Sequence, residues 1–138
     1  MYHRPGNIVL RIFQTPLTVA QAVATTTEYP ATTGIETVAG SDHMGIILLS
    51  TNASADACTI DAKLRHCDTT DGTYEDVANT DTVQIASTVD LAGIGAISVK
   101  ATDIKKFTRV SVTTGAGTNG PVLAIVGVYS GFAPHINV

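Results

Sequence analysis

The chain has few charged residues, only two cysteines and no long apolar run, and each scarcity excludes a class of protein. Two cysteines among 138 residues are too few for a scaffold held together by disulfides. Eight dispersed basic residues and a net charge of −4 exclude the basic stripe that binds nucleic acid. The longest apolar run, residues 44–49, is far shorter than the roughly 18 residues of a membrane helix, so no membrane partner is expected.

The N-terminus and the cysteines indicate synthesis in the cytoplasm. The apolar run at residues 8–10 is interrupted at once by Arg11, so we expect no export signal. Cys58 and Cys67 lie at an odd spacing along one predicted strand, which puts their side chains on opposite faces. The spacing therefore predicts two free thiols.

Residues 57–77 carry the clearest local pattern. Small or apolar side chains alternate with polar ones from Cys58 to Leu64, as in a strand with one buried and one wet face. The turn formers of residues 68–72 follow, and Gly72 can take the positive φ of a hairpin bulge. A short strand at residues 73–77 completes the predicted hairpin.

Most of the remaining chain also favours strands. Residues 44–51 are apolar enough to be buried on both faces, as in a central strand. Further strands are predicted at 82–89, 94–100, 107–114 and 122–129, and Gly95, Ile97 and Val99 are the better core candidates of their strand. Residues 8–13 read as an extended arm or a first strand. A short helix from Thr15 is possible, but short strands are favoured up to residue 40, and a single helical turn is predicted at 102–106, capped by Thr102 or Asp103.

The predicted fold class is an all-β antiparallel sandwich of about eight strands. We expect an N-terminal arm or first strand at residues 1–14, followed by one sandwich domain at 15–138. Periodicity alone does not separate a jelly roll from an immunoglobulin-like fold.

No set of residues predicts catalysis, a metal site or a cofactor. The four histidines are scattered, and His66 should face away from its neighbour Cys67. Asp68, Asp71, Glu75 and Asp76 suggest a calcium site, but they lack the spacing of a calcium loop, and aspartate is common in turns. The glycine-rich segment 115–120 joins two strands and opens no helix, so it does not predict phosphate binding.

Three segments carry a family resemblance. Residues 57–77, with the sequence Asp71-Gly-Thr-Tyr-Glu-Asp-Val77, resemble a hairpin of the head-decoration (cement) proteins of tailed bacteriophages. Residues 105–114 resemble that family's basic-aromatic-x-Arg-Val-x-Val strand, and residues 121–129 resemble its closing strand. Together these segments span roughly the C-terminal 80 residues.

The resemblance implies a jelly roll and a non-enzymatic function on the outer surface of a phage head. The expected partners are the major capsid protein and further copies of the chain, as a homotrimer, and the expected location is the virion after assembly in the host cytoplasm. The low charge fits such covering by other subunits, although a sandwich with threonine and serine on its wet faces would also have few charges. The expected contact residues lie in the arm: Arg4, Ile8, Leu10, Arg11 and Phe13.

Two other functions remain open from the sequence. Another small virion component, such as a tail or head-tail protein, could use the same kind of sandwich. A carbohydrate-binding module would need exposed aromatic rings, and the chain has only four tyrosines and three phenylalanines.

Overall fold

The computed structural model describes residues 8–18, 26–50, 58–78, 83–87, 93–114 and 122–131. In these ranges it has ten strands and one 3₁₀ turn at Ala101–Asp103. The strands are β1 (Val9–Thr18), β2 (Thr26–Tyr29), β3 (Ile35–Glu36), β4 (His43–Ser50), β5 (Cys58–Cys67), β6 (Glu75–Asp76), β7 (Val83–Ser87), β8 (Gly93–Lys100), β9 (Phe107–Thr114) and β10 (Val122–Ser130).

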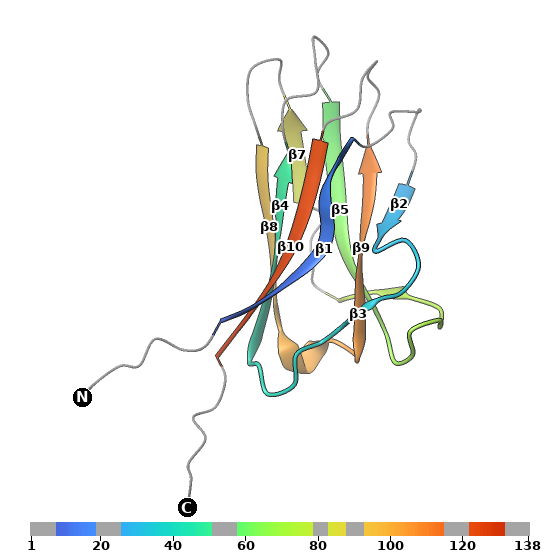
Figure 1. Ribbon diagram of the computed structural model, residues 1–138, viewed down its shortest axis with the longest axis vertical. Helices are drawn as coiled ribbons and strands as arrows, with labels where there is room; N and C mark the ends of the chain where they lie inside the picture. Colours follow the sequence, from blue (N-terminus) through green and yellow to red (C-terminus); the bar gives the residue numbers. More distant parts are fainter. Residues whose placement is uncertain are drawn as a thin grey trace, which may run out of the picture.

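The strands form two antiparallel sheets packed against each other (Figure 1). The first sheet has four strands in the order β1-β10-β4-β8. In the second, β9 and β5 pair in the middle; β2 and β3 pair with successive parts of β9, and β7 and β6 with successive parts of β5. Since β3 and β6 have two residues each, eight strands build the sandwich. The all-β antiparallel sandwich predicted from the sequence is confirmed.

The order of the eight strands is that of a jelly roll. The first strand pairs with the last (β1 with β10), the second with the seventh (β2 with β9), the third with the sixth (β4 with β8), and the fourth with the fifth (β5 with β7). This nested pairing is a long hairpin rolled into two sheets. It places the start of β1 beside the end of β10, because Val9 pairs with Tyr129.

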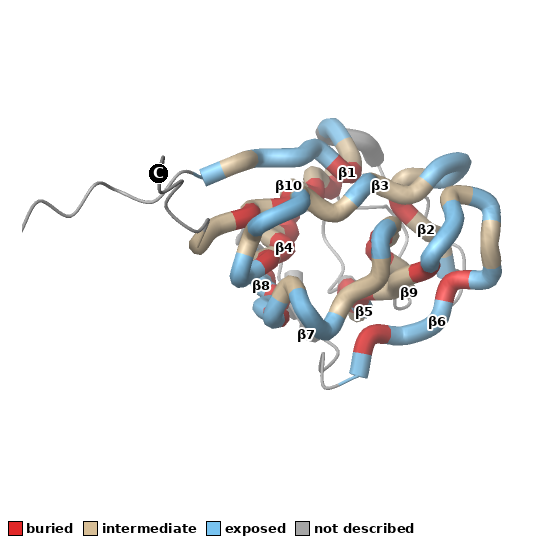
Figure 2. The backbone as a smooth tube through the Cα atoms, turned by 90° about the horizontal axis from the view of Figure 1, so that it is seen from below, coloured by how far each residue is buried: buried red, intermediate tan, exposed pale blue. Residues whose placement is uncertain are grey.

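The core lies between the two sheets and follows from the period-two alternation of the strands. Figure 2, viewed along the strands, shows the buried residues gathered between the layers. Met44, Ile46 and Leu48 of β4 face Ile60, Ala62 and Leu64 of β5 and Val110 and Val112 of β9 in one cluster of buried side chains. On β8, Ile97 and Val99 are buried, as the sequence predicts.

The first strand differs from a free arm. β1 pairs with β10 from Val9 to Thr18, so the predicted boundary between residues 14 and 15 falls inside a strand, and the helix considered from Thr15 does not form through Thr18. Phe13 has the parity of Val9 and Arg11, whose partners Tyr129 and Gly127 on β10 are buried, and only 3% of the residue is exposed. Phe13 therefore belongs to the core.

One local prediction was wrong, and a second was right in kind but not in its bounds and cap. Gly72 is not among the glycines with positive φ, which in the described chain are Gly40 and Gly131. It is needed for space, because a Cβ at this position would collide with Sγ of Cys67. The helical turn starts at Ala101, one residue earlier than predicted, and its N-cap residue Lys100 makes no side-chain cap.

Cysteine geometry agrees with the prediction where it is described. Cys58 and Cys67 are the two ends of β5, and Cys67 is a buried free thiol near the Thr69 hydroxyl. The side chain of Cys58 lies outside the described residues.

Candidate interaction surface

The outer face of the second sheet is polar, and its charged groups bind one another. Outward positions of its central strands and of β2 carry Thr26, Glu28, Asp61, Lys63, Arg65, Arg109, Ser111 and Thr113. Such side chains are typical of a sheet face in contact with water.

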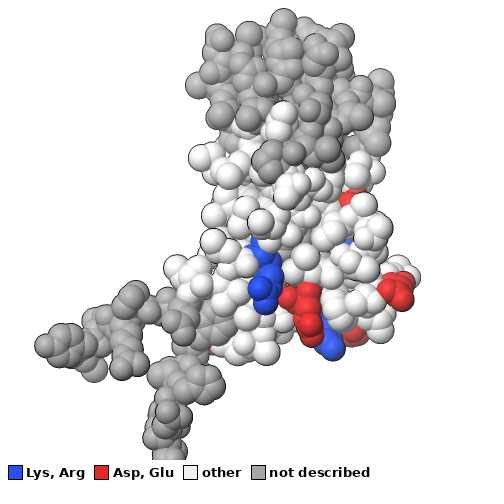
Figure 3. Space-filling model, in the orientation of Figure 1, with Lys and Arg blue, Asp and Glu red and all other residues white. Residues whose placement is uncertain are grey.

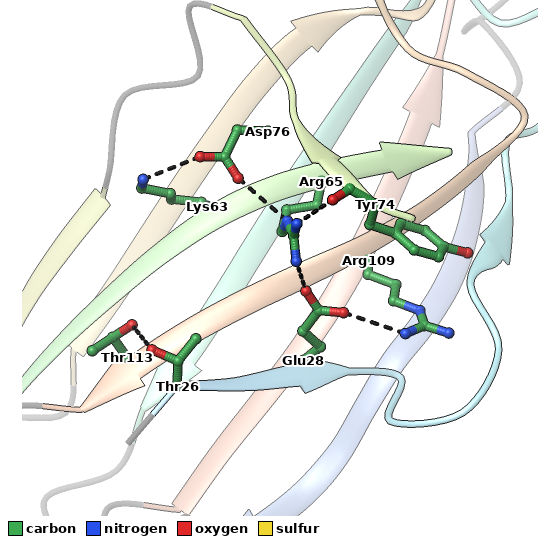
Figure 4. A network of polar contacts seen from close by, with 8 residues as sticks. All are labelled: Thr26, Glu28, Lys63, Arg65, Tyr74, Asp76, Arg109 and Thr113. Atoms are coloured by element: carbon green, nitrogen blue, oxygen red, sulfur yellow. Dashed lines mark hydrogen bonds and ion pairs between the residues drawn. The ribbon is translucent and has the colours of Figure 1, made fainter. Parts of the chain in front are cut away.

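Glu28 is the centre of this polar face (Figure 4). Its carboxylate accepts hydrogen bonds from Arg65 and, at 3.3 Å, from Arg109. Arg65 also donates to the backbone carbonyl of Tyr74, and the guanidinium of Arg109 lies 4.3 Å from the centre of the Tyr74 ring. The Asp76 carboxylate forms ion pairs with Arg65 at 3.3 Å and with Lys63 at 3.2 Å. These contacts tie β2, β5, β9 and the 68–77 hairpin together.

The acidic turn is neutralised by basic side chains of the chain itself. Lys105 contacts Glu75 and lies 3.7 Å from Asp68. The hydrogen bond from Lys105, with its charge, lowers the pKa of Glu75, and the same hydrogen bond raises the pKa of Lys105. Among the described residues no three histidine, cysteine, aspartate or glutamate side chains group as a metal site. Cation pairing and turn formation therefore account for the carboxylates that suggested calcium.

His66, near the same end of β5, contacts other parts of the chain through both ring nitrogens. Its Nδ1 accepts a hydrogen bond from the backbone N–H of Lys105 at 3.2 Å, and its Nε2 lies 3.3 Å from Glu75. Because a backbone N–H can only donate, the neutral ring carries its proton on Nε2. Cys67 instead lies near Thr69, so the two neighbours have different partners, as their positions on the strand predict.

The outer face of the four-stranded sheet is apolar, in contrast to the polar face. We call it the apolar face and define it by outward residues of all four strands: Leu10, Ile12, Gly45, Ile47, Leu49, Ile94, Ala96, Ala124, Val126 and Val128. Leu10, Ile12 and Ile94 are 60, 61 and 75% exposed, and Leu49 is 43% exposed. Large exposed apolar surfaces of this kind mark interaction sites.

Sheet register makes the apolar face continuous. Ile12, Val126, Ile47 and Ala96 form one row across the four strands, and Leu10, Val128, Gly45 and Ser98 form the row below it. A third row joins Ala124, Leu49 and Ile94. On the described parts of β10, β4 and β8, the only outward lysine, arginine, aspartate or glutamate is Lys100, at the end of β8. In Figure 3 the described atoms on the left are largely uncharged, and the charged side chains gather at the lower centre and right.

The predicted contact residues lie in different environments. Ile8 and Leu10 are exposed, at 64 and 60%, and Arg11 is also exposed. Phe13 is buried against the core, so its side chain is not available to a partner. Arg4 lies outside the described residues. Ile8, Leu10 and Arg11 thus form a short exposed segment at the start of β1.

Sequence reasoning missed most of the apolar face. Residues 44–51 were predicted to be buried on both faces, but in β4 only Met44, Ile46, Leu48 and Ser50 are buried, while Leu49 is exposed. The apolar outward residues were therefore assigned to a core that covers one side alone. The sequence did contain a signal for the apolar face, because one strand carries apolar side chains at both its inward and its outward positions.

Neither a membrane-spanning helix in the described residues nor a similarity to known proteins indicates a function. No helix among the described residues has the length and apolar character to cross a membrane. The chain matches no protein-family model, no curated protein and no solved structure.

Proposed function

We propose that this protein is a non-enzymatic decoration protein that binds the outer surface of a tailed-phage head and clamps neighbouring coat subunits, as a homotrimer. The observation that carries the proposal is the contrast between the two outer faces of the sandwich. One face is polar, with its charges paired within the chain, and the other is an uncharged apolar face. A rigid body with one such face suits a subunit that buries one side in a larger assembly.

The fold is consistent with the resemblance that suggested this function. The segments that resemble decoration proteins form β5 with the 68–77 hairpin, β9, and β10. Two of them, β5 and β9, are the paired centre of the second sheet, and β10 lies inside the first. The jelly roll is the architecture that the resemblance implies.

Clamping follows from mass action. A subunit that contacts two coat proteins at once binds the assembled shell more tightly than dissociated coat protein, so its binding stabilises the shell. Repetition around a symmetry axis adds avidity, and each contact can therefore be weak. Ile8, Leu10 and Arg11, exposed at the start of β1, are the proposed shell contacts.

Aromatic burial argues against the carbohydrate-binding alternative. Phe13, Tyr29, Tyr74 and Tyr129 are each 5% exposed or less. Phe107 is half-buried, and Lys106 lies 5.4 Å from the centre of its ring. The described aromatics therefore offer no open ring on which a sugar could stack.

Cosedimentation tests the proposal. We expect the chain to pellet with undecorated heads of the virus that encodes it, and to saturate at a fixed number of copies per head. The double variant Ile8→Ser and Leu10→Ser should bind more weakly, because it removes exposed apolar contacts but no core residue. Thr26→Ser, on the polar face, is the control and should bind like the wild type.

Two outcomes would contradict the proposal. Failure of the wild-type chain to bind heads at any concentration would refute it. Binding to purified tails in place of heads would identify the alternative, a tail or head-tail component.

A further inference from the structure

We infer that the apolar face, apart from Leu10 at its edge, is the contact surface between copies of this chain. The inference concerns self-association, and it stands whether or not the larger partner is a phage head. It names the surface that a homo-oligomer of this chain would bury.

The outer faces of the two sheets carry different kinds of side chain. Outward positions of β5 and β9 carry threonine, serine, aspartate, lysine and arginine, which are typical of a face in water. Outward positions of β4 and β10 carry Ile47, Leu49, Ala124, Val126 and Val128. A strand that is apolar at both parities has the sequence of a strand covered on both sides. The core covers one side of β4 and β10, so a second cover is missing.

The charge of the apolar face also limits what can cover it. A nucleic acid, an anionic lipid surface or an acidic peptide would require cations, and the described outward positions of β10, β4 and β8 offer only Lys100 and the adjacent His43, both at the margin, while Arg11 lies on the edge strand β1. The occupant must therefore present an uncharged, apolar and nearly flat surface. A second copy of the chain presents such a surface by identity, and sheets with apolar faces pack about 10 Å apart.

The footprint of the apolar face indicates what kind of contact two copies would form. Four strands spaced about 4.8 Å apart and three to four rows about 7 Å apart give a footprint of roughly 400–500 Å² per copy. Two copies would bury roughly 800–1,000 Å², which is at the lower limit of specific interfaces. Contacts of this size are typical of weak, transient complexes, so we expect association that grows with protein concentration and is strengthened where many copies gather on one particle.

Two positions allow the face to be tested without disturbing the fold. Ile94 is 75% exposed and Leu49 is 43% exposed, so a glutamate at either position stays hydrated in the single copy. In an assembly the same carboxylate would be buried without a partner, which is strongly unfavourable. Ile94 lies on β8 and Leu49 on β4, and the two residues pair directly.

The experiment is sedimentation velocity over a concentration series, with Ile94→Glu, Leu49→Glu and the control Thr26→Glu on the polar face. We expect the wild type to form dimers or trimers as concentration rises, and each variant on the apolar face to associate roughly tenfold more weakly or worse. Thr26→Glu adds the same charge at an exposed position of β2 and should associate like the wild type. Melting temperatures measured at low concentration should be alike for all four proteins, which excludes misfolding as the cause.

The outcomes separate this inference from the proposed function. A wild type that stays monomeric throughout, or face variants that associate like the wild type, would overturn the inference. If the wild type is monomeric and Ile94→Glu abolishes head binding, the head covers the apolar face: the inference fails and the decoration function survives. If the face variants lose self-association while no protein binds heads, the inference holds and the decoration function fails.

Discussion

At the scale of single residues, two glycines show how closely the sandwich is packed. A Cβ on Gly127 of β10 would lie 2.7 Å from Cε2 of Phe13, whose ring covers this position from β1. Gly45 also lies in a central strand, β4, and is half-buried. The nearest neighbours of a Cβ added there would be backbone oxygens at 3.8 and 3.9 Å. The absence of a side chain is therefore required at Gly127 and not at Gly45.

We predict that Gly127→Ala lowers the free energy of unfolding by about 1–3 kcal/mol, because the added methyl group displaces the Phe13 ring. Gly45→Ala is the control and should be neutral or slightly stabilising, since it reduces the freedom of the unfolded chain without a clash. Urea unfolding measures both. In a Phe13→Val background the Gly127→Ala loss should shrink, and equal losses in the two backgrounds would contradict the contact.

Glu75 supplies a pH-dependent contact. Lys105 lowers the pKa of Glu75 in the folded chain, so this carboxylate stabilises the fold at every pH above its unfolded pKa. The contribution is lost as the pH falls through the lowered folded pKa.

We therefore predict that Glu75→Gln is less stable than the wild type at neutral pH. The difference should disappear in acid, once the pH is below the lowered folded pKa of Glu75, because both proteins then carry an uncharged side chain. Thermal unfolding across a pH series measures this, and parallel curves at every pH would refute the assignment.

At the scale of elements, β4 divides the molecule into a covered and an uncovered side. Leu48 is completely buried between the sheets, whereas its neighbour Leu49 lies on the apolar face. The two residues have the same side chain and the same strand, so only their environment differs.

We predict that Leu48→Ala lowers the free energy of unfolding by about 2–5 kcal/mol, because it leaves a cavity in the core. Leu49→Ala should lower it by about 1 kcal/mol or less when measured on dilute protein, because its side chain is already partly in water. Similar losses at both positions would show that the apolar face is covered within a single copy.

Elements also show how far sequence reasoning reaches. The strands at 58–67, 107–114 and 122–130 were predictable because their side chains alternate between two faces, which gives a period-two pattern in the sequence. The burial of Phe13 was not, because residues 8–13 carry apolar side chains at both parities, and only the pairing with β10, more than 100 residues away in sequence, decides which parity faces the core. The apolar face was not predictable for a related reason. An apolar pattern predicts that side chains are buried, but it does not tell whether they are buried within the same chain or against a partner.

At the scale of the whole molecule, the sandwich has two faces with different chemistry. Ion pairs around Glu28 hold the polar face together, while the apolar face and the exposed start of β1 remain as contact surfaces. In the proposed arrangement, copies of the chain meet through the rest of the apolar face, and Ile8, Leu10 and Arg11 reach the coat. Two weak contacts of this kind, repeated over a shell, would act together.

Heat-induced rupture of the head tests the central claim most directly. Undecorated heads are mixed with increasing amounts of the chain, and shell disruption is followed by light scattering or by release of packaged nucleic acid. The account predicts a rupture temperature that rises with added chain and levels off when the outer sites are filled, because the bound chain stabilises the assembled shell over free coat protein. A rupture temperature that stays unchanged while the chain is shown to saturate the heads would contradict the clamping function.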